Sequence, residues 1–464
     1  MTLAKVIDIE QVFQDQKIGS FHIKLLLLSF LILMTDGFDL GAAAYAGPGI
    51  LKEWNLSGPE LGALFSSSIA AGFVGPPLFG FLSDKFGRKR VIVCGAYSFG
   101  LFTLAAVLTS NLNELIAVRV LAGVALGGML PIVVTLNNEF APARFRATLV
   151  VLIFTGVTFG GGLPGFFAAK LMGEYGWRIL FWIGGIAPIV IASILAIALP
   201  ESIKFLALRP QRRNELVALL RRLRSDLVIG PDTGFVISGE DNRSRFSMRA
   251  LLEGRLSVLT PLFWISNFVA VMSLYFMNQW TPTVLSASGV SVAQAAIATT
   301  LFQFGGTLAG LISMRFLDKY GFIPVPILFA CSIPIAACIG IPNLSPYLLL
   351  ALLFGAGFCI LGLQFGNIAT EANIYPTYIR AWGVGSNFAI GRIGGALGPL
   401  LGGFAFGGKL PAQQIFLIAT LPLIVGLVAT LAIMPLYQRH IRILRASRGR
   451  ETIAKAAPET VAAP

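Results

Sequence analysis

The chain has 464 residues, of which 56% are hydrophobic and only 12% are charged, and its mean hydropathy is +0.79. Soluble globular proteins carry about 25% charged residues, so this composition excludes that class. The formal net charge of +13 does not indicate nucleic-acid binding, because the basic residues lie mostly in short connections between long apolar runs, as the positive-inside rule produces.

Apolar runs recur along the chain at the length that a helix needs to cross the hydrocarbon layer, roughly 20 residues. We therefore expect an all-α polytopic membrane protein with 12 transmembrane helices. Acidic residues precede the first run, which is of full span length, so we expect it to be retained and not cleaved as a signal peptide. The expected spans are 24–45, 61–82, 90–109, 113–138, 147–170, 177–199, 257–280, 293–316, 324–341, 345–369, 381–407 and 411–436.

The first span contains two carboxyl groups, Asp36 and Asp39. Residues three apart share one face of a helix, so the two side chains project together. A charge in mid-membrane costs roughly 2.5–3.5 kcal/mol on insertion scales, and the pair therefore needs partners, water or protons. A helix that ended early would expose both groups instead. The run stays apolar and small, however, until Gly47-Pro48-Gly49, where we expect the helix to break.

A polar, arginine-rich segment separates the sixth span from the seventh. Within it, 211–224 has the pattern of a basic amphipathic helix on the membrane surface. After the last span the chain is basic from Arg439 to Arg450 and then rich in alanine and proline, which predicts disorder. The expected divisions are a cytoplasmic N-terminal segment 1–23, an N-terminal six-helix bundle 24–200, a cytoplasmic central loop 201–256, a C-terminal six-helix bundle 257–436 and a cytoplasmic tail 437–464.

Lysine and arginine are distributed unevenly between the two sides of the predicted membrane protein. The connections after spans 2, 4, 6, 8 and 10, together with the C-terminal tail, hold nearly all of them. Cytoplasmic loops carry this excess. We therefore expect a multi-pass protein of the cytoplasmic (inner) membrane with both termini in the cytoplasm.

The two halves of the chain repeat at an ungapped offset of 234 residues, at which Pro48 aligns with Pro282 and Asp84 with Asp318. The offset holds across several spans and connections. It predicts two six-helix halves related by an axis along the membrane normal, with the substrate path between them. Charges inside the spans do not repeat, so a structural need shared by both halves does not explain them. At the same offset, Asp36, Asp39, Arg119 and Arg392 align with Ala270, Ser273, Leu353 and Thr158.

These four charged residues lie at similar depth, in the middle or outer half of the bilayer, at a rise of about 1.5 Å per residue. One interpretation is a purely structural ion-pair network. The other is that one carboxylate takes a proton and frees an arginine, whose planar guanidinium donates two parallel hydrogen bonds to a bound carboxylate. We favour Arg392, which lies among glycines, as the residue that binds the substrate carboxylate. The alternatives are that Arg119 binds it, or that Arg119 pairs permanently with Asp36 or Asp39.

Uncharged polar and aromatic residues inside the spans are further candidates for the binding site. Amides inside a bilayer need hydrogen-bond partners, and bonds between helices explain them as well as a substrate does. Aromatic side chains in apolar spans mostly pack against other side chains. The candidates are Gln303, Phe304, Tyr275, Asn278, Gln364, Asn367, Asn387 and Phe388. Trp280 lies at a span end, where an interfacial position is expected.

The connection 80–90, GFLSDKFGRKR, resembles the signature loop between helices 2 and 3 of the major facilitator superfamily. A shorter echo follows at 318–321, and PES at 200–202 also resembles that superfamily. The resemblance implies two six-helix bundles that work by alternating access, with a cytoplasmic charge network that holds the outward-facing state. Exposed pairs of this kind are weak enough to break in every cycle. The implied network comprises Asp84, Arg88, Glu139 and Arg144, with Asp318 as the counterpart in the second half.

Within that superfamily, Asp36-Gly37-Phe38-Asp39 resembles the D-G-[aromatic]-D signature of the aromatic acid:H+ symporter family. The segments RVLAG at 119–123, QFGG at 303–306 and GRIGG at 391–395 resemble the same family. The resemblance implies that the helix 1 aspartates and the arginines of helices 4 and 11 are important for transport. Members of the family import benzoate, hydroxybenzoates, protocatechuate and related acids together with protons.

We therefore expect a proton-coupled importer of aromatic carboxylates of the benzoate, hydroxybenzoate or protocatechuate class. Its partners are the acid, protons and the lipid bilayer, with no nucleic acid and no cofactor besides the proton gradient, and we expect it to work as a monomer. The alternatives are an H+ symporter for another organic acid or a sugar, a drug/H+ antiporter, or a non-transporting sensor. An enzyme is not expected, because the predicted spans contain no histidine, metal cluster or nucleophile–base motif.

Overall fold

Helices make up nearly all of the computed structural model, which describes residues 6–9, 12, 18–224, 229–230, 233–236, 248–375 and 379–456. The first half of the chain forms one bundle, in which α2 packs on α7 and α8, α5 on α6 and α8, and α6 on α3 and α4. Its helices are α2 (Ser20–Glu53), α3 (Gly58–Ala71), α4 (Gly75–Phe86), α5 (Arg88–Ala105), α6 (Leu112–Phe140), α7 (Arg146–Tyr175) and α8 (Arg178–Ala198).

The second half forms a matching bundle, in which α12 packs on α16 and α17, α13 on α15, and α14 on α15 and α17. Its helices are α12 (Leu256–Ala287), α13 (Val292–Tyr320), α14 (Pro324–Ile339), α15 (Pro346–Ile374), α16 (Arg380–Gly407) and α17 (Ala412–Ala456). Among the described residues, 11 helices are long and apolar enough to cross a membrane, counting α3 and α4 as one. The 16-residue α14 fills the position of the ninth expected span. The prediction of an all-α membrane protein with two six-helix bundles is confirmed.

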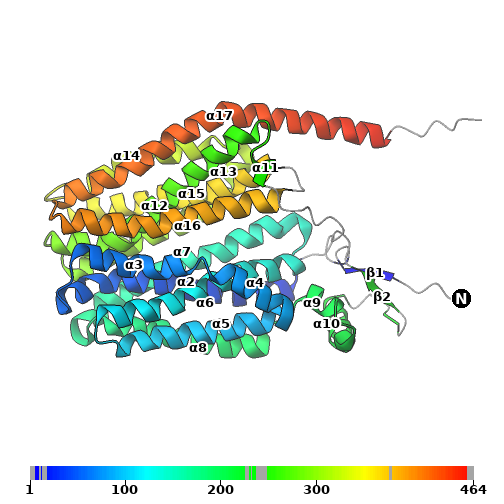
Figure 1. The fold of residues 1–464 in the computed structure, drawn as a ribbon, viewed down its shortest axis with the longest axis horizontal. Coiled ribbons are helices and arrows are strands. Elements are labelled where there is room, and N and C mark those ends of the chain that lie inside the picture. Colours follow the sequence, from blue (N-terminus) through cyan, green and yellow to red (C-terminus); the bar gives the residue numbers. More distant parts are fainter. Residues whose placement is uncertain are drawn as a thin grey trace, which may run out of the picture.

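The two bundles lie side by side, with their helices roughly along the long axis of the molecule (Figure 1). Both described ends of the chain lie at the same end of the molecule, which we call the terminal end; the opposite end is the far end. Helix α17 continues through the basic segment after the last expected span to Ala456, so that part of the tail is helical. The rest of the Ala- and Pro-rich tail, 457–464, lies outside the described residues.

At the terminal end, short elements of the central segment pack beneath the N-terminal bundle (Figure 1). They are α9 (Ile203–Ala207), a turn at Pro210–Arg212, α10 (Arg213–Leu223), and β2 (Gly234–Val236), which pairs in parallel with β1 (Val6–Asp8). The short helix α11 (Met248–Leu251) lies instead at the C-terminal bundle, where it contacts α12. The expected amphipathic helix is present as α10. Its apolar face packs on protein, since Leu216 and Leu220 are buried in the same cluster as Phe205 and Leu206.

The expected break at Gly47-Pro48-Gly49 is wrong, because α2 continues without interruption to Glu53. A proline inside a helix removes one backbone hydrogen bond, a loss that neighbouring helices can tolerate inside a membrane. The two glycines serve close packing. A Cβ on Gly47 would lie 2.7 Å from the Phe65 ring, and one on Gly49 would lie 3.0 Å from Trp177.

The break falls instead in the second span, which we expected to be one continuous helix. It ends at Ala71 and starts again at Gly75, with prolines in the first turn of α4. In an uninterrupted helix the Gly72 carbonyl would accept the N–H of residue 76. Residue 76 is a proline, which has no N–H, so the Gly72 carbonyl is left free for another donor.

Helix pairs α2–α12, α3–α16 and α7–α13 join the two bundles. Toward the far end, Trp280 packs its ring 5.6 Å from that of Phe65, and the Ser66 hydroxyl donates to the Ala396 carbonyl at 2.7 Å. Trp280 is only 1% exposed, so the expectation of an interfacial tryptophan is wrong. Nearer the middle, the Thr158 and Thr307 hydroxyls hydrogen-bond at 2.8 Å. These contacts close the far half of the interface between the bundles.

Candidate functional site

Of Arg119 and Arg392, the two arginines that lie well inside the expected spans, one is fully engaged within the N-terminal bundle. Arg119 on α6 donates two parallel hydrogen bonds to Asp39 on α2, at 2.6 and 2.7 Å. Neither side chain is more than 2% exposed. The hydroxyl of Thr103 donates to Asp39 at 3.4 Å, and Arg119 also donates to Ser68 at 3.3 Å. Because both charges are hydrogen-bonded and neutralise each other, this pair is stable inside a bilayer.

The other arginine has a weaker set of partners. Arg392 on α16 is half-buried at the interface between the bundles and donates one hydrogen bond of 2.7 Å to the Gly72 carbonyl. That carbonyl is the one freed by Pro76 at the break between α3 and α4. The Phe388 ring, one turn back on α16, lies 5.2 Å from the guanidinium. Arg392 therefore keeps donors for an anion, and a neutral carbonyl holds it in place.

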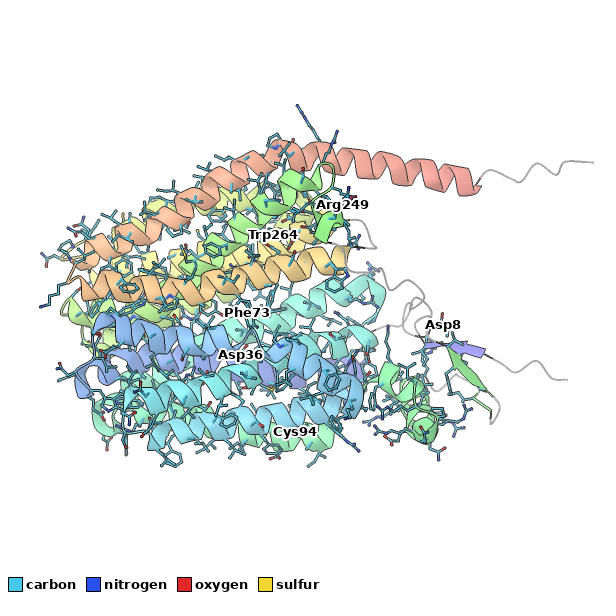
Figure 2. All side chains as sticks on the ribbon, viewed as in Figure 1. Asp8, Asp36, Phe73, Cys94, Arg249 and Trp264 are labelled. Atoms are coloured by element: carbon cyan, nitrogen blue, oxygen red, sulfur yellow. The ribbon has the colours of Figure 1, made fainter. Side chains whose placement is uncertain are left out.

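The second aspartate of helix α2 faces this arginine. Asp36 lies in the middle part of the molecule (Figure 2) and is half-buried. It interacts electrostatically with Arg392, and Tyr275 on α12 interacts with both charges. Among the described residues, Asp36 has no basic nitrogen within ion-pair distance, whereas Asp39 has Arg119. The two neighbouring carboxylates thus occupy different environments, one paired inside a bundle and one at the interface.

Three of the predicted polar and aromatic residues lie close to the same interface. Gln303 on α13 donates to Asn278 on α12 at 3.3 Å, and a Cβ on Gly161 of α7 would meet the Gln303 amide. Phe304 packs between two rings of α7, 5.8 Å from Phe159 and 5.9 Å from Phe166. Gln303 and Phe304 thus lie on the C-terminal bundle and contact α7 of the N-terminal bundle, as residues of a site between the bundles would.

The remaining predicted residues lie within the C-terminal bundle. Asn367 is fully buried and accepts a hydrogen bond from Ser266 at 3.4 Å, and the buried amide nitrogen of Gln364 has no partner among the described residues. Asn387 donates to Glu371 at 2.6 Å. Glu371 is 1% exposed and was not singled out from the sequence. The available signal was a carboxylate close to the end of an apolar run, at a position where the 234-residue offset places Asn137 in the first half.

The residues of the expected cytoplasmic network have their described partners within the N-terminal part of the chain. Arg88 forms an ion pair with Glu139, which also accepts a hydrogen bond from Ser202 at 2.6 Å. Asp84 is exposed and interacts with Arg88 through charge alone. Arg144 is exposed and lies over the Phe145 ring at 5.5 Å. The side chain of Asp318 lies outside the described part of the structure.

Residues 29–370 match the model of a family described as the Major Facilitator Superfamily. A gallate transporter of Pseudomonas putida is 31% identical over 429 residues, which is 92% of this chain and 95% of that protein. A 4-hydroxybenzoate transporter of Pseudomonas aeruginosa is 32% identical over 92% of this chain and 95% of its own length. A benzoate transport protein of Acinetobacter baylyi is 28% identical over 93% of each chain.

Solved structures show the same fold at lower sequence identity. A bacterial homologue of the lysosomal transporter Spinster, in an inward-facing conformation, aligns with a TM-score of 0.66 at 17% identity, covering 92% of this chain and 98% of that one. The xylose transporter of Escherichia coli, in a partially occluded inward-open conformation, aligns with a TM-score of 0.65 at 18% identity, covering 90% and 99%. At these identities the likeness concerns the fold.

Proposed function

Since the chain belongs to the major facilitator superfamily and is a membrane transporter, we propose that it imports small aromatic carboxylates together with protons by alternating access. The observation that carries the proposal is the position of Arg392. It lies at the interface between the bundles, is held by a neutral carbonyl, and faces a carboxyl that it does not bind directly. Arg119 is a weaker candidate for the substrate, because Asp39 already takes up its paired donors.

The carboxylate of the substrate binds Arg392 in this proposal. A guanidinium can donate two parallel hydrogen bonds to a planar carboxylate, and a single hydrogen bond to Gly72 leaves donors for this purpose. The Phe388 and Tyr275 rings next to Arg392 supply faces for an aromatic ring. The hydrogen-bonded amides Gln303 and Asn278 can recognise ring hydroxyls. Benzoate, hydroxybenzoates and gallate, the acids named for the related transporters, all fit this chemistry.

Asp36 is the proton-carrying group in this proposal. When Asp36 is charged, it attracts Arg392 and competes with an incoming anion. Protonation removes that competition, so the substrate carboxylate can take its place beside the arginine. The loaded site then holds one anion and one guanidinium, a combination that crosses the membrane interior at lower cost than an unpaired charge. Asp39, held by two hydrogen bonds from Arg119, positions α2 against α6 in this proposal.

The basic terminal end faces the cytoplasm in this proposal, in the inner membrane, with both termini inside. In this orientation the far half, which is closed, lies on the outer side of the membrane, so the conformation is that of an inward-facing transporter. Asp84, Arg88, Glu139 and Arg144 hold the opposite, outward-facing state, in which Asp318 makes the equivalent contact of the second half. Each chain contains a complete pair of bundles and works as a monomer. The bundles span 24–200 and 257–436, joined by the loop 201–256.

Ligand binding to the detergent-purified protein tests the substrate class directly. We expect benzoate and 4-hydroxybenzoate to bind, as measured by calorimetry. Benzamide has the ring without the charge, and cyclohexanecarboxylate has the charge without the aromatic ring; each should bind at least about tenfold more weakly. D-xylose serves as a control for a sugar site. Binding of D-xylose without binding of any aromatic acid would contradict the proposed substrate class.

A further inference from the structure

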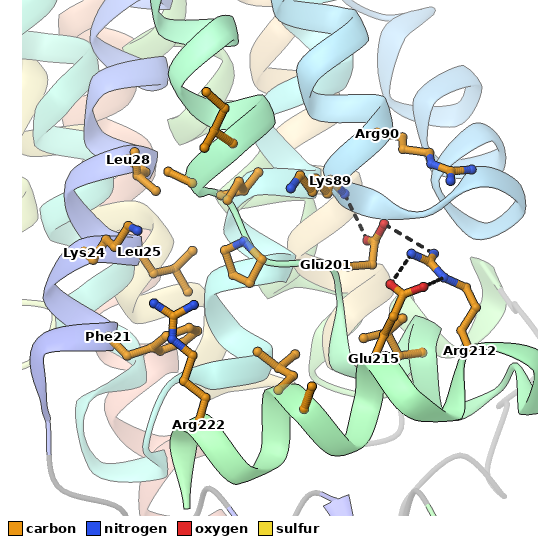
Figure 3. A pocket seen from close by; sticks show the side chains of 17 residues that line it. Phe21, Lys24, Leu25, Leu28, Lys89, Arg90, Glu201, Arg212, Glu215 and Arg222 are labelled. Carbon is orange, nitrogen blue, oxygen red and sulfur yellow. Dashed lines mark hydrogen bonds and ion pairs between the residues drawn. The ribbon is translucent and has the colours of Figure 1, made fainter.

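A cavity lies at the terminal end of the N-terminal bundle. Its volume is about 570 Å³, and it opens between the beginnings of α2 and α5, the end of α8, and helix α10 (Figure 3). One part of its lining is apolar and comes mainly from α2 and α8: Phe21, Leu25, Leu28, Ile197, Ala198 and Leu199. The other part is charged and comes mainly from α5 and α10.

The charged part of this cavity has an excess of basic groups. Five basic side chains, Lys24, Lys89, Arg90, Arg212 and Arg222, face two acidic ones, Glu201 and Glu215, which leaves a net charge of +3 (5 − 2).

The two carboxylates are already engaged by one arginine. Arg212 pairs with Glu215 at 2.5 Å and lies 3.9 Å from Glu201. The hydrogen bonds from Arg212 hold the pKa of Glu215 below its usual range, so that pair stays charged. Lys24 and Arg222 have no hydrogen bond or ion pair with any residue that the structure describes, and they lie on the side of the cavity away from Glu201 and Glu215 in Figure 3. The free positive charge is therefore concentrated next to the apolar wall.

The apolar wall continues into a surface that faces outward from the bundle. Ile197, at the edge of the cavity, is 88% exposed, and Ile194, Val190 and Ile186 extend the same exposed stripe along α8. Residues three and four apart share a helix face, so this stripe leads from the cavity toward the middle of the membrane. The site thus combines a cationic pocket at the end of the helices with an apolar track along one of them.

We propose that this cavity binds the headgroup of an anionic phospholipid, with the phosphate between Lys24 and Arg222 and an acyl chain along the exposed face of α8. Basic pockets between transmembrane helices bind anionic lipid headgroups in this way. A free phosphate would use the same basic groups but would gain nothing from Leu25, Leu28 and Ile197. The bound lipid would also join α10 to α2, because Arg222 and Lys24 contact the same phosphate.

Native mass spectrometry and thermal unfolding of the full chain test this proposal, with phosphatidylglycerol and phosphatidylcholine as the lipids. We expect the wild type to retain phosphatidylglycerol and to be stabilised by it. The double variant Lys24→Gln/Arg222→Gln should bind it about 30-fold more weakly, because each basic group near an anionic lipid contributes roughly a fivefold gain in affinity. The matched control is Arg249→Gln/Lys319→Gln. It removes the same charge from two exposed residues outside the cavity and should bind the lipid like the wild type.

Two results would overturn the assignment. Equal binding of phosphatidylglycerol by the wild type and by Lys24→Gln/Arg222→Gln would show that the cavity is not the lipid site. Stabilisation of the wild type by glycerol phosphate as strong as that by phosphatidylglycerol would show that the cavity binds a free anion and not a lipid. Neither result depends on whether the protein transports aromatic acids, so a failure of the lipid proposal can be distinguished from a failure of the transport proposal.

Discussion

Arg119 and Arg392 differ in which existing partner a substrate would have to displace. To bind an anion, Arg119 would have to release a carboxylate that accepts two hydrogen bonds from it, and Asp39 would then be a buried, unpaired charge. Arg392 would keep its carbonyl partner and use its remaining donors. Breaking a buried pair costs roughly 3–5 kcal/mol, so the second route is the cheaper one.

Replacing Arg392 with methionine should weaken binding of 4-hydroxybenzoate by at least about 30-fold, because removing one partner of a buried, hydrogen-bonded charge pair costs roughly 2–5 kcal/mol. Arg392→Lys keeps the charge but not the planar pair of donors. Its affinity for 4-hydroxybenzoate should therefore lie between the affinities of the wild type and of Arg392→Met. Calorimetry on the purified variants measures the change. Arg178→Met, which removes an arginine paired with Glu53 at the far end, is the control. Unchanged binding in Arg392→Met would exclude Arg392 as the carboxylate site.

Asp36→Asn should separate binding from energy coupling. Asparagine resembles the protonated acid, so we expect the variant to bind 4-hydroxybenzoate and to exchange labelled for unlabelled substrate across a proteoliposome membrane. It should lose accumulation against a gradient, since no proton can be released on the other side. Exchange and accumulation are measured on the same preparation. Full accumulation by Asp36→Asn would mean that another group carries the proton.

Asp39→Asn should instead affect stability. It leaves Arg119 buried and unpaired, which costs roughly 3–5 kcal/mol and should lower the unfolding temperature of the purified protein. The double variant Asp39→Leu/Arg119→Met removes both charges and should recover most of the loss. Thermal unfolding monitored by tryptophan fluorescence compares the variants. If the double variant were as unstable as the single one, the pair would not be the cause.

The sequence was sufficient to select the charged residues but not to pair them. The break in the 234-residue repeat identified Asp36, Asp39, Arg119 and Arg392, and helical rise placed them at similar depth. Which aspartate meets which arginine depends on how α2 and α6 are rotated against each other, and spacing along one chain does not contain that information. Glu371 was missed because a single carboxylate near a helix end is also what a solvent-exposed end would show.

At the scale of whole helices, two segments that combine glycine and proline look alike in sequence, but one leaves its helix intact and the other interrupts it. Gly47-Pro48-Gly49 does not break α2, because the glycines accommodate Phe65 and Trp177 from neighbouring helices. Adjacent prolines after Gly75 do break the second span, and the break supplies the carbonyl that holds Arg392. Glycine and proline lower helix propensity in both places, and we expected a break only in the first, because the packing of neighbouring helices decides which segment breaks.

Helices α3 and α16 approach each other closely at the far end, where both have glycines. A Cβ on Gly403 would lie 2.7 Å from the Gly58 carbonyl oxygen, so neither position tolerates a side chain while the far half is closed. Close backbone approach of this kind allows two membrane helices to pack without polar groups. The far end can therefore seal tightly and still separate during a transport cycle.

Gly58→Leu should hold the far end open. Spin labels at Lys52→Cys and Gln414→Cys, exposed residues at the far ends of the two bundles, should move apart in this variant, in a background without the four native cysteines. Pulsed electron spin resonance measures the label-to-label distance. Gly173→Leu is the matched control, because a Cβ there meets nothing within 4 Å. An unchanged distance in Gly58→Leu would contradict the proposed role of these glycines.

At the scale of the whole molecule, two similar bundles enclose a site whose charged residues differ from one bundle to the other. The repeated halves build two similar bundles, a feature that hydropathy and the constant offset were enough to predict. The charged groups that the proposal uses occur in only one half each: Asp36 comes from the first bundle and Arg392 from the second. In this proposal, proton and substrate therefore bind at the interface between the bundles, which allows binding of one to influence the other.

Proton-driven uptake of labelled 4-hydroxybenzoate into proteoliposomes tests this account most directly. With an imposed inward proton gradient, the account predicts accumulation above the external concentration, collapse of that accumulation when a protonophore is added, and no uptake of D-xylose. Protein-free liposomes control for passive entry of the neutral acid. Uptake of 4-hydroxybenzoate that only equilibrates, with or without the protonophore, would contradict proton coupling, and no protein-dependent uptake of any aromatic acid would contradict the substrate class.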